Sequence, residues 1–178
     1  MLRLFAAIRP PAPVRARLML AMGGVEGARW QSDEQLHCTL RFFGEVDRHA
    51  AADLLAALAS LSMPAPTMSV EGTGSFDRHG RVDTLWARVV PREPVAALAA
   101  KVERAARAAG LAPDRRTHLP HITLARGARM TGSAAWVERT QGLTTEAWVP
   151  DRWGVYESTL GRGGADYSLV ESFGWGRL

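Results

Sequence analysis

The chain has 178 residues, 47% of them hydrophobic and 22% charged, and these ordinary globular values exclude a disordered, collagen-like or coiled-coil chain. A single cysteine, Cys38, excludes an internal disulfide bond and a cysteine-rich zinc site. The net charge of +4 is carried almost entirely by arginine, which permits a phosphate-bearing partner but also fits a GC-rich coding bias.

No apolar run reaches the ~18 residues that a membrane-spanning helix needs. The apolar start of the chain ends at Arg9 and Pro10, which is too early for a signal peptide. We therefore expect a cytoplasmic protein that does not bind membranes. The sequence does not reveal the oligomeric state, and a monomer without an obligate protein partner is the default expectation.

Hydrophobic periodicity and the turn residues between runs predict four strands and two helices in the first half of the chain. In chain order these are a strand over residues 2–8, a helix over 14–22, a strand over 36–43, a helix over 49–61, and strands over 67–74 and 82–90. Asp47 is expected to cap the second helix, and residues 77–81 predict a tight turn between the last two strands.

The second half opens with the clearest helix, over residues 93–109, which has Pro94 in its first turn and Gly110 just past its end. A strand over 121–126, a helix over 133–139 and strands over 144–149, 153–160 and 167–173 follow, with the last turn at 161–164. Strands joined by hairpins, without a regular βαβ alternation, favour an α+β fold with largely antiparallel sheets.

One four-residue pattern occurs twice, about half a chain apart. Residues 37–40 (His-Cys-Thr-Leu) and 121–124 (His-Ile-Thr-Leu) both lie in predicted strands. Because side chains alternate faces along a strand, the His and Thr of each motif share one face, and Cys38 or Ile122 points to the core. If the two strands lie side by side about a pseudo-twofold axis, two imidazoles and two hydroxyls meet in one cleft.

Such a cleft suits phosphoryl transfer. Imidazole, with an ordinary pKa of ~6.5, can take a proton from water or give one to a leaving oxygen near neutral pH. The threonine hydroxyls can donate to phosphate oxygens, and Arg126 can add a charged fork. This chemistry needs no metal or other cofactor. A zinc site built from His37, His118 and His121 is disfavoured, because no nearby carboxylate completes it.

Strand alternation also selects further candidates. Arg41 and Phe43 share the parity of His37, which predicts a phosphate contact or a solvated strand end for Arg41. It makes Phe43 a candidate base-stacking residue, with core packing as the alternative. Arg126 falls one residue out of the alternation of His121 and Thr123, so it reaches the groove only through a strand end or a β-bulge.

Around these residues the sequence resembles a known family. Paired His-x-Thr-hydrophobic motifs half a chain apart are the signature of the 2H phosphoesterase superfamily. The segments LRLFAAIRP, HCTLRFFGEV and LPHITLAR, with Tyr167, Leu169 and Phe173 near the end, resemble the RNA 2′,3′-cyclic phosphodiesterases of its LigT-like branch. The similarity runs over nearly the whole chain.

The resemblance implies one bilobal domain over residues 1–178, with two pseudo-symmetric lobes of mainly antiparallel sheet flanking a central groove and helices outside. It implies metal-free hydrolysis of RNA 2′,3′-cyclic phosphate ends to 2′-phosphates, and for some members the reverse joining of RNA through a 2′–5′ bond. Carried over by motif, His37 is the proton donor to the leaving 3′ oxygen and His121 is the base that activates water. Thr39, Thr123 and Arg126 hold the phosphate.

The sequence leaves open which histidine is the acid, because a dyad makes the two nearly equivalent. It also leaves open the cellular substrate. RNA ends or cyclic nucleotides are the expected partners. The alternatives are a 2H phosphoesterase acting on another cyclic or 2′–5′ linked nucleotide, and a non-catalytic RNA-binding module that keeps the groove.

Overall fold

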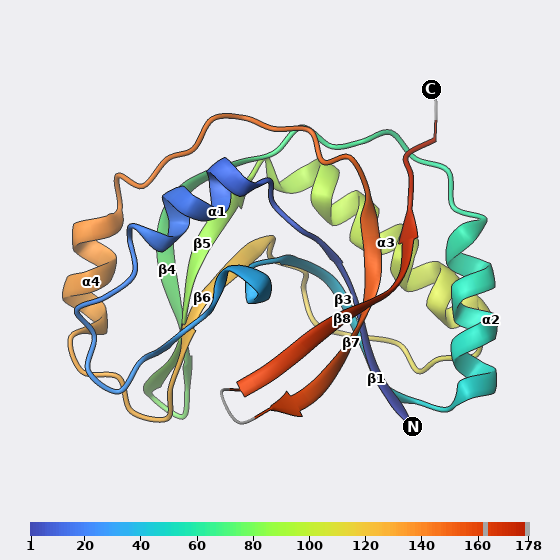
Figure 1. Ribbon diagram of the computed structural model, residues 1–178, viewed down its shortest axis with the longest axis horizontal. Coiled ribbons are helices and arrows are strands. Elements are labelled where there is room, and N and C mark those ends of the chain that lie inside the picture. The colour runs from blue at the N-terminus through green and yellow to red at the C-terminus, as the bar shows by residue number, and fades with distance from the viewer. Residues whose placement is uncertain (162–163, 177–178) are drawn as a thin grey trace.

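The structure is a computed structural model that describes residues 1–161 and 164–176. Its elements follow one another along the chain as shown in Figure 1: β1 (Leu2–Ile8), α1 (Ala12–Met19), β2 (Arg29–Trp30), a 3-10 turn η1 (Asp33–Gln35), β3 (Cys38–Val46), α2 (Arg48–Ala59), β4 (Ser69–Arg78), β5 (Arg81–Val90), α3 (Arg92–Ala108), β6 (His121–Arg126), α4 (Ser133–Thr140), β7 (Trp153–Gly161) and β8 (Gly164–Phe173). Within the described ranges, no helix has the length and apolar character needed to cross a membrane.

The strands form one antiparallel sheet in the order β4-β5-β6-β3-β1-β7-β8, with β2 pairing to β6 off this path. The sheet divides into two lobes, β4-β5-β6 and β3-β1-β7-β8. They meet where β3 pairs with β6 at a single position, Cys38 opposite Ile122. The expected α+β fold with two lobes is confirmed, and the lobes join at the second residue of each repeated motif.

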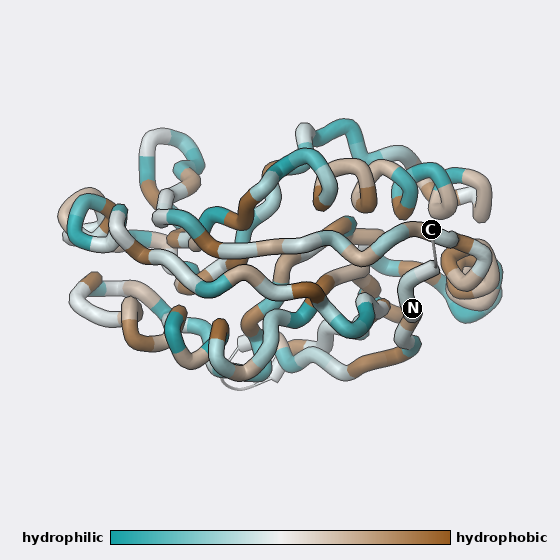
Figure 2. The backbone as a smooth tube through the Cα atoms, turned by 90° about the horizontal axis from the view of Figure 1, so that it is seen from above, coloured by the Kyte–Doolittle hydropathy of each residue, from teal (hydrophilic) through white to brown (hydrophobic). Residues whose placement is uncertain are grey.

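The helices cover the sheet with faces that the sequence spacing dictates. On α3 the buried positions recur every three or four residues, at Val95, Leu98, Ala99, Val102, Ala105 and Ala106. Figure 2 shows the hydrophobic turns of this helix facing the strands and its hydrophilic side facing away. Helix α3 packs on β3, α2 packs on α3, and α4 packs on β4. The Asp47 carboxylate accepts from the Ala50 amide at 2.9 Å, which confirms the predicted N-cap of α2.

The strand predicted over residues 144–149 is wrong. This segment meets β4 only at two isolated bridges, Glu71 with Thr144 and Met68 with Trp148. Between them the Val70 amide donates to the Thr145 hydroxyl at 2.9 Å, so a side chain takes the place of a backbone partner and the ladder is interrupted.

The two turns predicted between strands can be compared with the structure. The predicted turn at 77–81 is shorter than expected: β4 runs to Arg78 and β5 begins at Arg81, and His79 and Gly80 take the positive φ angles of the turn. Of the turn predicted at 161–164, residues 162–163 lie outside the described residues.

Candidate active site

Four polar side chains from the two motifs form an array at the junction of the lobes. Continuing the Cys38–Ile122 register by one residue in each direction sets His37 opposite Thr123, and Thr39 opposite His121. All four are partly exposed, whereas Cys38 and Ile122 between them are fully buried. The two histidines are diagonal neighbours, which in antiparallel strands lie about 7–8 Å apart. That spacing leaves room for a phosphate between them.

Both imidazoles are held by the same local hydrogen bond. His37 Nδ1 lies 2.7 Å from the carbonyl oxygen of Gln35, and His121 Nδ1 lies 2.7 Å from that of Leu119. A carbonyl oxygen only accepts, so Nδ1 carries the hydrogen in each ring. Each Nε2 is therefore the atom free to take or give a proton.

Burial governs the protonation of both rings. Burial lowers the pKa of His37 from 6.5 to about 4, and the positive charge of Arg126 and the His121 ring lower it further. The hydrogen bond to the Gln35 carbonyl opposes this shift. Burial also lowers the pKa of His121, and the Leu119 carbonyl opposes this effect. In the free protein at neutral pH both imidazoles are consequently neutral, and an anion bound between them raises both pKa values.

Aromatic rings fix the orientation of each imidazole in the same way. Tyr167 stands edge-on to His37 at 5.1 Å between ring centroids and 89°, and the Phe5 ring lies 4.8 Å from it at 36°. Phe76 stands edge-on to His121 at 5.0 Å and 88°, with Trp86 at 6.1 Å. Edge-to-face packing of this kind favours one ring orientation. It supports the same Nε2 direction that the Nδ1 bonds set.

Both motif strands carry a β-bulge at the fourth residue of the motif. On β3, Thr39 pairs with Ala7 and Arg41 with Ala6, so Leu40 is the extra residue. On β6, Thr123 pairs with Trp86 and Ala125 with Leu85, so Leu124 is the extra residue. Each bulge shifts the alternation by one, so the fifth residue after the histidine joins the histidine face.

The bulge on β6 brings Arg126 to the histidines. Its positive charge contributes to lowering the pKa of both His37 and His121, which places it within electrostatic reach of both. Its side chain is exposed and makes no hydrogen bond or ion pair within the described ranges. The bulge that the sequence required for Arg126 is present, and the guanidinium is available to an anion.

The equivalent bulge on β3 corrects the predictions for Arg41 and Phe43. Arg41 is buried, at 6% exposure, and its guanidinium pairs with the Glu103 carboxylate and donates to the Ala112 carbonyl at 2.6 Å. It ties β3 to α3 and is not a free phosphate ligand. Phe43 packs against the core and beneath the Arg41 guanidinium, 5.5 Å away. Phe42, at 44% exposure, takes the groove position instead.

His118 and Cys38 have structural positions. His118 Nε2 donates to the Thr39 carbonyl at 2.9 Å, which links the loop before β6 to the first motif. Cys38 is fully buried, and burial raises the pKa of its thiol to about 12. It faces the core, as the alternation predicted. The described residues contain no group of three or more His, Cys, Asp or Glu placed to hold a metal ion.

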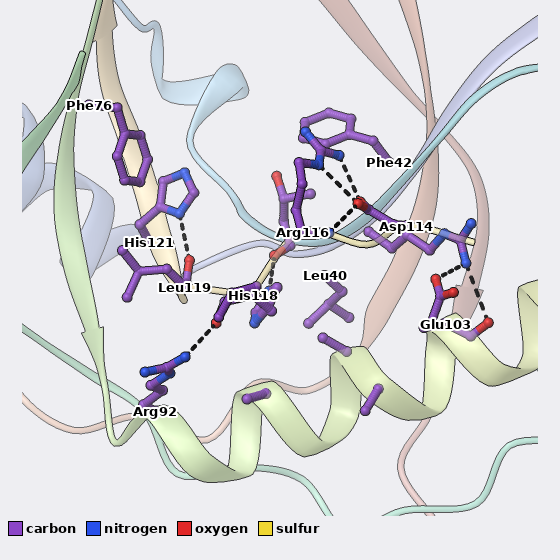
Figure 3. A pocket seen from close by; sticks show the side chains of 16 residues that line it. Leu40, Phe42, Phe76, Arg92, Glu103, Asp114, Arg116, His118, Leu119 and His121 are labelled. Atoms are coloured by element: carbon purple, nitrogen blue, oxygen red, sulfur yellow. Dashed lines mark hydrogen bonds and ion pairs between the residues drawn. The ribbon is translucent and has the colours of Figure 1, made fainter. Parts of the chain in front are cut away.

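A cavity of about 730 Å³ opens beside Thr39 and His121 and runs toward α3 (Figure 3). Phe42, Phe76 and Arg92 are among its lining residues. None of these three was selected from the sequence. The two bulges could have been inferred together, since the same shift that Arg126 requires, applied to the first motif, selects Phe42. Phe76 and Arg92 are brought in by tertiary packing alone.

Comparison with known proteins agrees with this geometry. A model of the LigT-like phosphoesterase family matches residues 8–86 and again residues 89–167, one match for each motif. An RNA 2′,3′-cyclic phosphodiesterase of Aeropyrum pernix is 36% identical over 100 residues, which are 54% of this chain and 57% of that protein. A protein of the same name from Archaeoglobus fulgidus is 27% identical over 141 residues, 78% of this chain and 80% of that one.

Solved structures show the same fold. Escherichia coli LigT complexed with 3′-AMP superposes with a TM-score of 0.82 at 23% identity, covering 99% of each chain. The protein TT0787 of Thermus thermophilus superposes with a TM-score of 0.78 at 25% identity, covering 97% of each chain. Because the family model spans most of the sequence, and each of its two matches contains one His-x-Thr motif, this chain belongs to the LigT-like phosphoesterase family.

Proposed function

We propose that this protein hydrolyses RNA 2′,3′-cyclic phosphate ends to 2′-phosphomonoesters through two-histidine acid/base catalysis without a metal. The observation that carries the proposal is the matched pair of imidazoles, each bonded through Nδ1 to a backbone carbonyl and each with Nε2 free. The curated relatives that are named RNA 2′,3′-cyclic phosphodiesterases support the choice of substrate.

The reaction uses both histidines once. Nε2 of His121 takes a proton from water as the oxygen forms its bond to phosphorus. The bond between phosphorus and the 3′ oxygen breaks, and Nε2–H of His37 gives its proton to that oxygen. The product keeps the phosphate on the 2′ oxygen. Attack and departure must lie on opposite sides of phosphorus, and two diagonal imidazoles fit this requirement.

The remaining polar groups stabilise charge. The hydroxyls of Thr39 and Thr123, each opposite a histidine, donate to the non-bridging phosphate oxygens. Arg126 adds a charged donor for the negative charge that grows in the transition state. The negative phosphate also raises the pKa of His37, which is neutral in the free protein, so that substrate binding itself charges the acid. The reverse reaction, joining RNA through a 2′–5′ bond, uses the same groups with their roles exchanged.

The test is turnover of a 2′,3′-cyclic nucleotide with EDTA present. Loss of either proton-transfer group typically costs about 10²–10⁴-fold in rate, so His37→Ala and His121→Ala should each lose at least about a hundredfold. His49→Ala is a matched control, because the His49 side chain is 92% exposed on α2. Normal turnover in either active-site variant would remove the role given to that residue. RNA binding without any product would favour a non-catalytic module.

A further inference from the structure

The large cavity adjoins the histidine–threonine array but is not part of it. Thr39 and His121 lie on its wall, whereas His37, Thr123 and Arg126 do not line it. A cyclic phosphate held between the two imidazoles therefore occupies only the edge of this space. The volume of about 730 Å³ falls within the range of ~300–1,000 Å³ that small-molecule sites occupy. It can hold a further part of the substrate.

The two sides of the array differ in the room they offer. On the side of His37, the cavity bounded by Phe5, Tyr156 and Tyr167 measures only about 10 Å³, because aromatic rings fill it. On the side of His121 the cavity is open. When the cyclic end of an RNA strand is bound at the array, the rest of the strand needs space beside it. That space lies toward α3.

The floor and entrance of the cavity suit a nucleobase. Ala96, Ala99 and Ala100 of α3 line it, and residues spaced by three and four fall on one face of a helix. Their small side chains are the reason that space remains there. The rings of Phe42 and Phe76 stand on its two sides in Figure 3. Flat apolar surfaces of this kind stack or cover unpaired bases.

The charges on the cavity wall leave one net positive charge. Arg116 donates to the Asp114 carboxylate through Nε at 3.0 Å and Nη2 at 2.7 Å, and Arg41 pairs with Glu103. Arg92 pairs with no carboxylate among the described residues, and its Nη2 donates to the His118 carbonyl at 3.3 Å. The other N–H groups of Arg92 remain available, and a single phosphodiester carries the complementary charge.

We propose that this cavity binds the nucleotide immediately 5′ of the cyclic end, with its base over the alanine floor and the linking phosphodiester at Arg92. The inference rests on the proposed function and names its substrate class, a strand of at least two nucleotides instead of a cyclic mononucleotide. Because the contact includes an ion pair at an exposed arginine, the preference for the longer substrate decreases as salt concentration rises.

The experiment compares kcat/KM for a 2′,3′-cyclic mononucleotide with that for a dinucleotide ending in the same cyclic nucleotide. The wild-type protein should prefer the dinucleotide. Loss of one charge-assisted hydrogen bond corresponds to about tenfold or more in affinity, and Arg92→Ala should reduce the preference by that factor. Ala96→Leu, which occupies part of the cavity while keeping a good helix former, should also reduce it.

Two exposed positions on α3 that do not line the cavity provide matched controls, Arg104→Ala and Ala97→Leu, and both should keep the wild-type preference. Equal losses on both substrates in Arg92→Ala and Ala96→Leu would place the terminal base in the cavity and overturn the proposal. A wild-type protein that does not distinguish the two substrates would overturn it as well. If the wild-type protein hydrolyses neither substrate, the proposed function fails and this inference fails with it.

Discussion

Protonation of His37 is expected to destabilise the fold by a measurable amount. Burial lowers the pKa of His37 from 6.5 to about 4 in the folded protein. Between these values the unfolded chain binds a proton that the folded protein does not, so stability is complete above about pH 6.5 and decreases as the pH falls toward 4. One pKa unit corresponds to about 1.36 kcal/mol, so the stability lost by pH 4 is about 3 kcal/mol.

Urea unfolding of the wild-type protein and of His37→Gln, at about pH 7.5 and about pH 4.5, measures this contribution. The free energy of unfolding should fall by about 2–3 kcal/mol more in the wild-type protein than in His37→Gln over that interval. His49→Gln serves as a control for the loss of an imidazole as such, because the His49 side chain is 92% exposed. It should keep the wild-type profile.

The same pH dependence in the wild-type protein and in His37→Gln would contradict the lowered pKa of His37. It would mean that the imidazole is not held neutral by its surroundings. Nε2 would then carry a proton more readily in the free protein, and substrate binding would not be needed to charge the acid.

Three further predictions concern the groups around the histidines. Glu103→Gln should lower the free energy of unfolding in urea by about 2–4 kcal/mol, because it leaves the buried Arg41 guanidinium without its counter-ion. A raised KM with an unchanged free energy of unfolding would instead indicate that Arg41 binds substrate. Phe42→Ala should raise KM for RNA several-fold with little change in the thermal midpoint, whereas Phe43→Ala should lower the midpoint with little change in KM; the opposite pattern would contradict the bulge assignment. The pH profile of kcat/KM should peak below about pH 6.5, because the pKa values of both His37 and His121 are lowered in the free enzyme, and an optimum above pH 8 would contradict this.

Strand alternation was sufficient to predict the core of the site. Because period-two geometry is local, it assigned Thr39 and Thr123 to the histidine face and Cys38 to the core without knowledge of the fold. Hydrophobic periodicity and the turn residues also predicted the boundaries of the most regular elements closely. The strand expected over residues 121–126 is β6 unchanged, and the helix expected over 93–109 is α3 shifted by one residue.

The predictions failed where the alternation is broken or where tertiary packing decides. A bulge at Leu40 moved Arg41 into the core and Phe42 to the groove, and parity alone cannot reveal an extra residue in a strand. The pairing of Arg41 with Glu103 joins residues far apart in sequence, so no local pattern reports it. The cavity also depends on contacts between distant parts of the chain, because the alanines of α3 that line it come to lie near β3 only after folding. No local pattern in the sequence therefore predicts it.

The position of the phosphate in the product is the most direct test of two-histidine hydrolysis at RNA ends. An RNA oligonucleotide ending in a 2′,3′-cyclic phosphate is incubated with the protein in EDTA, and the terminal phosphate is located by phosphorus NMR. We expect a 2′-phosphate, formed without added metal and lost in His37→Ala and in His121→Ala. A 3′-phosphate would contradict the leaving oxygen assigned to His37, and the absence of any product would contradict two-histidine hydrolysis of RNA ends by this protein.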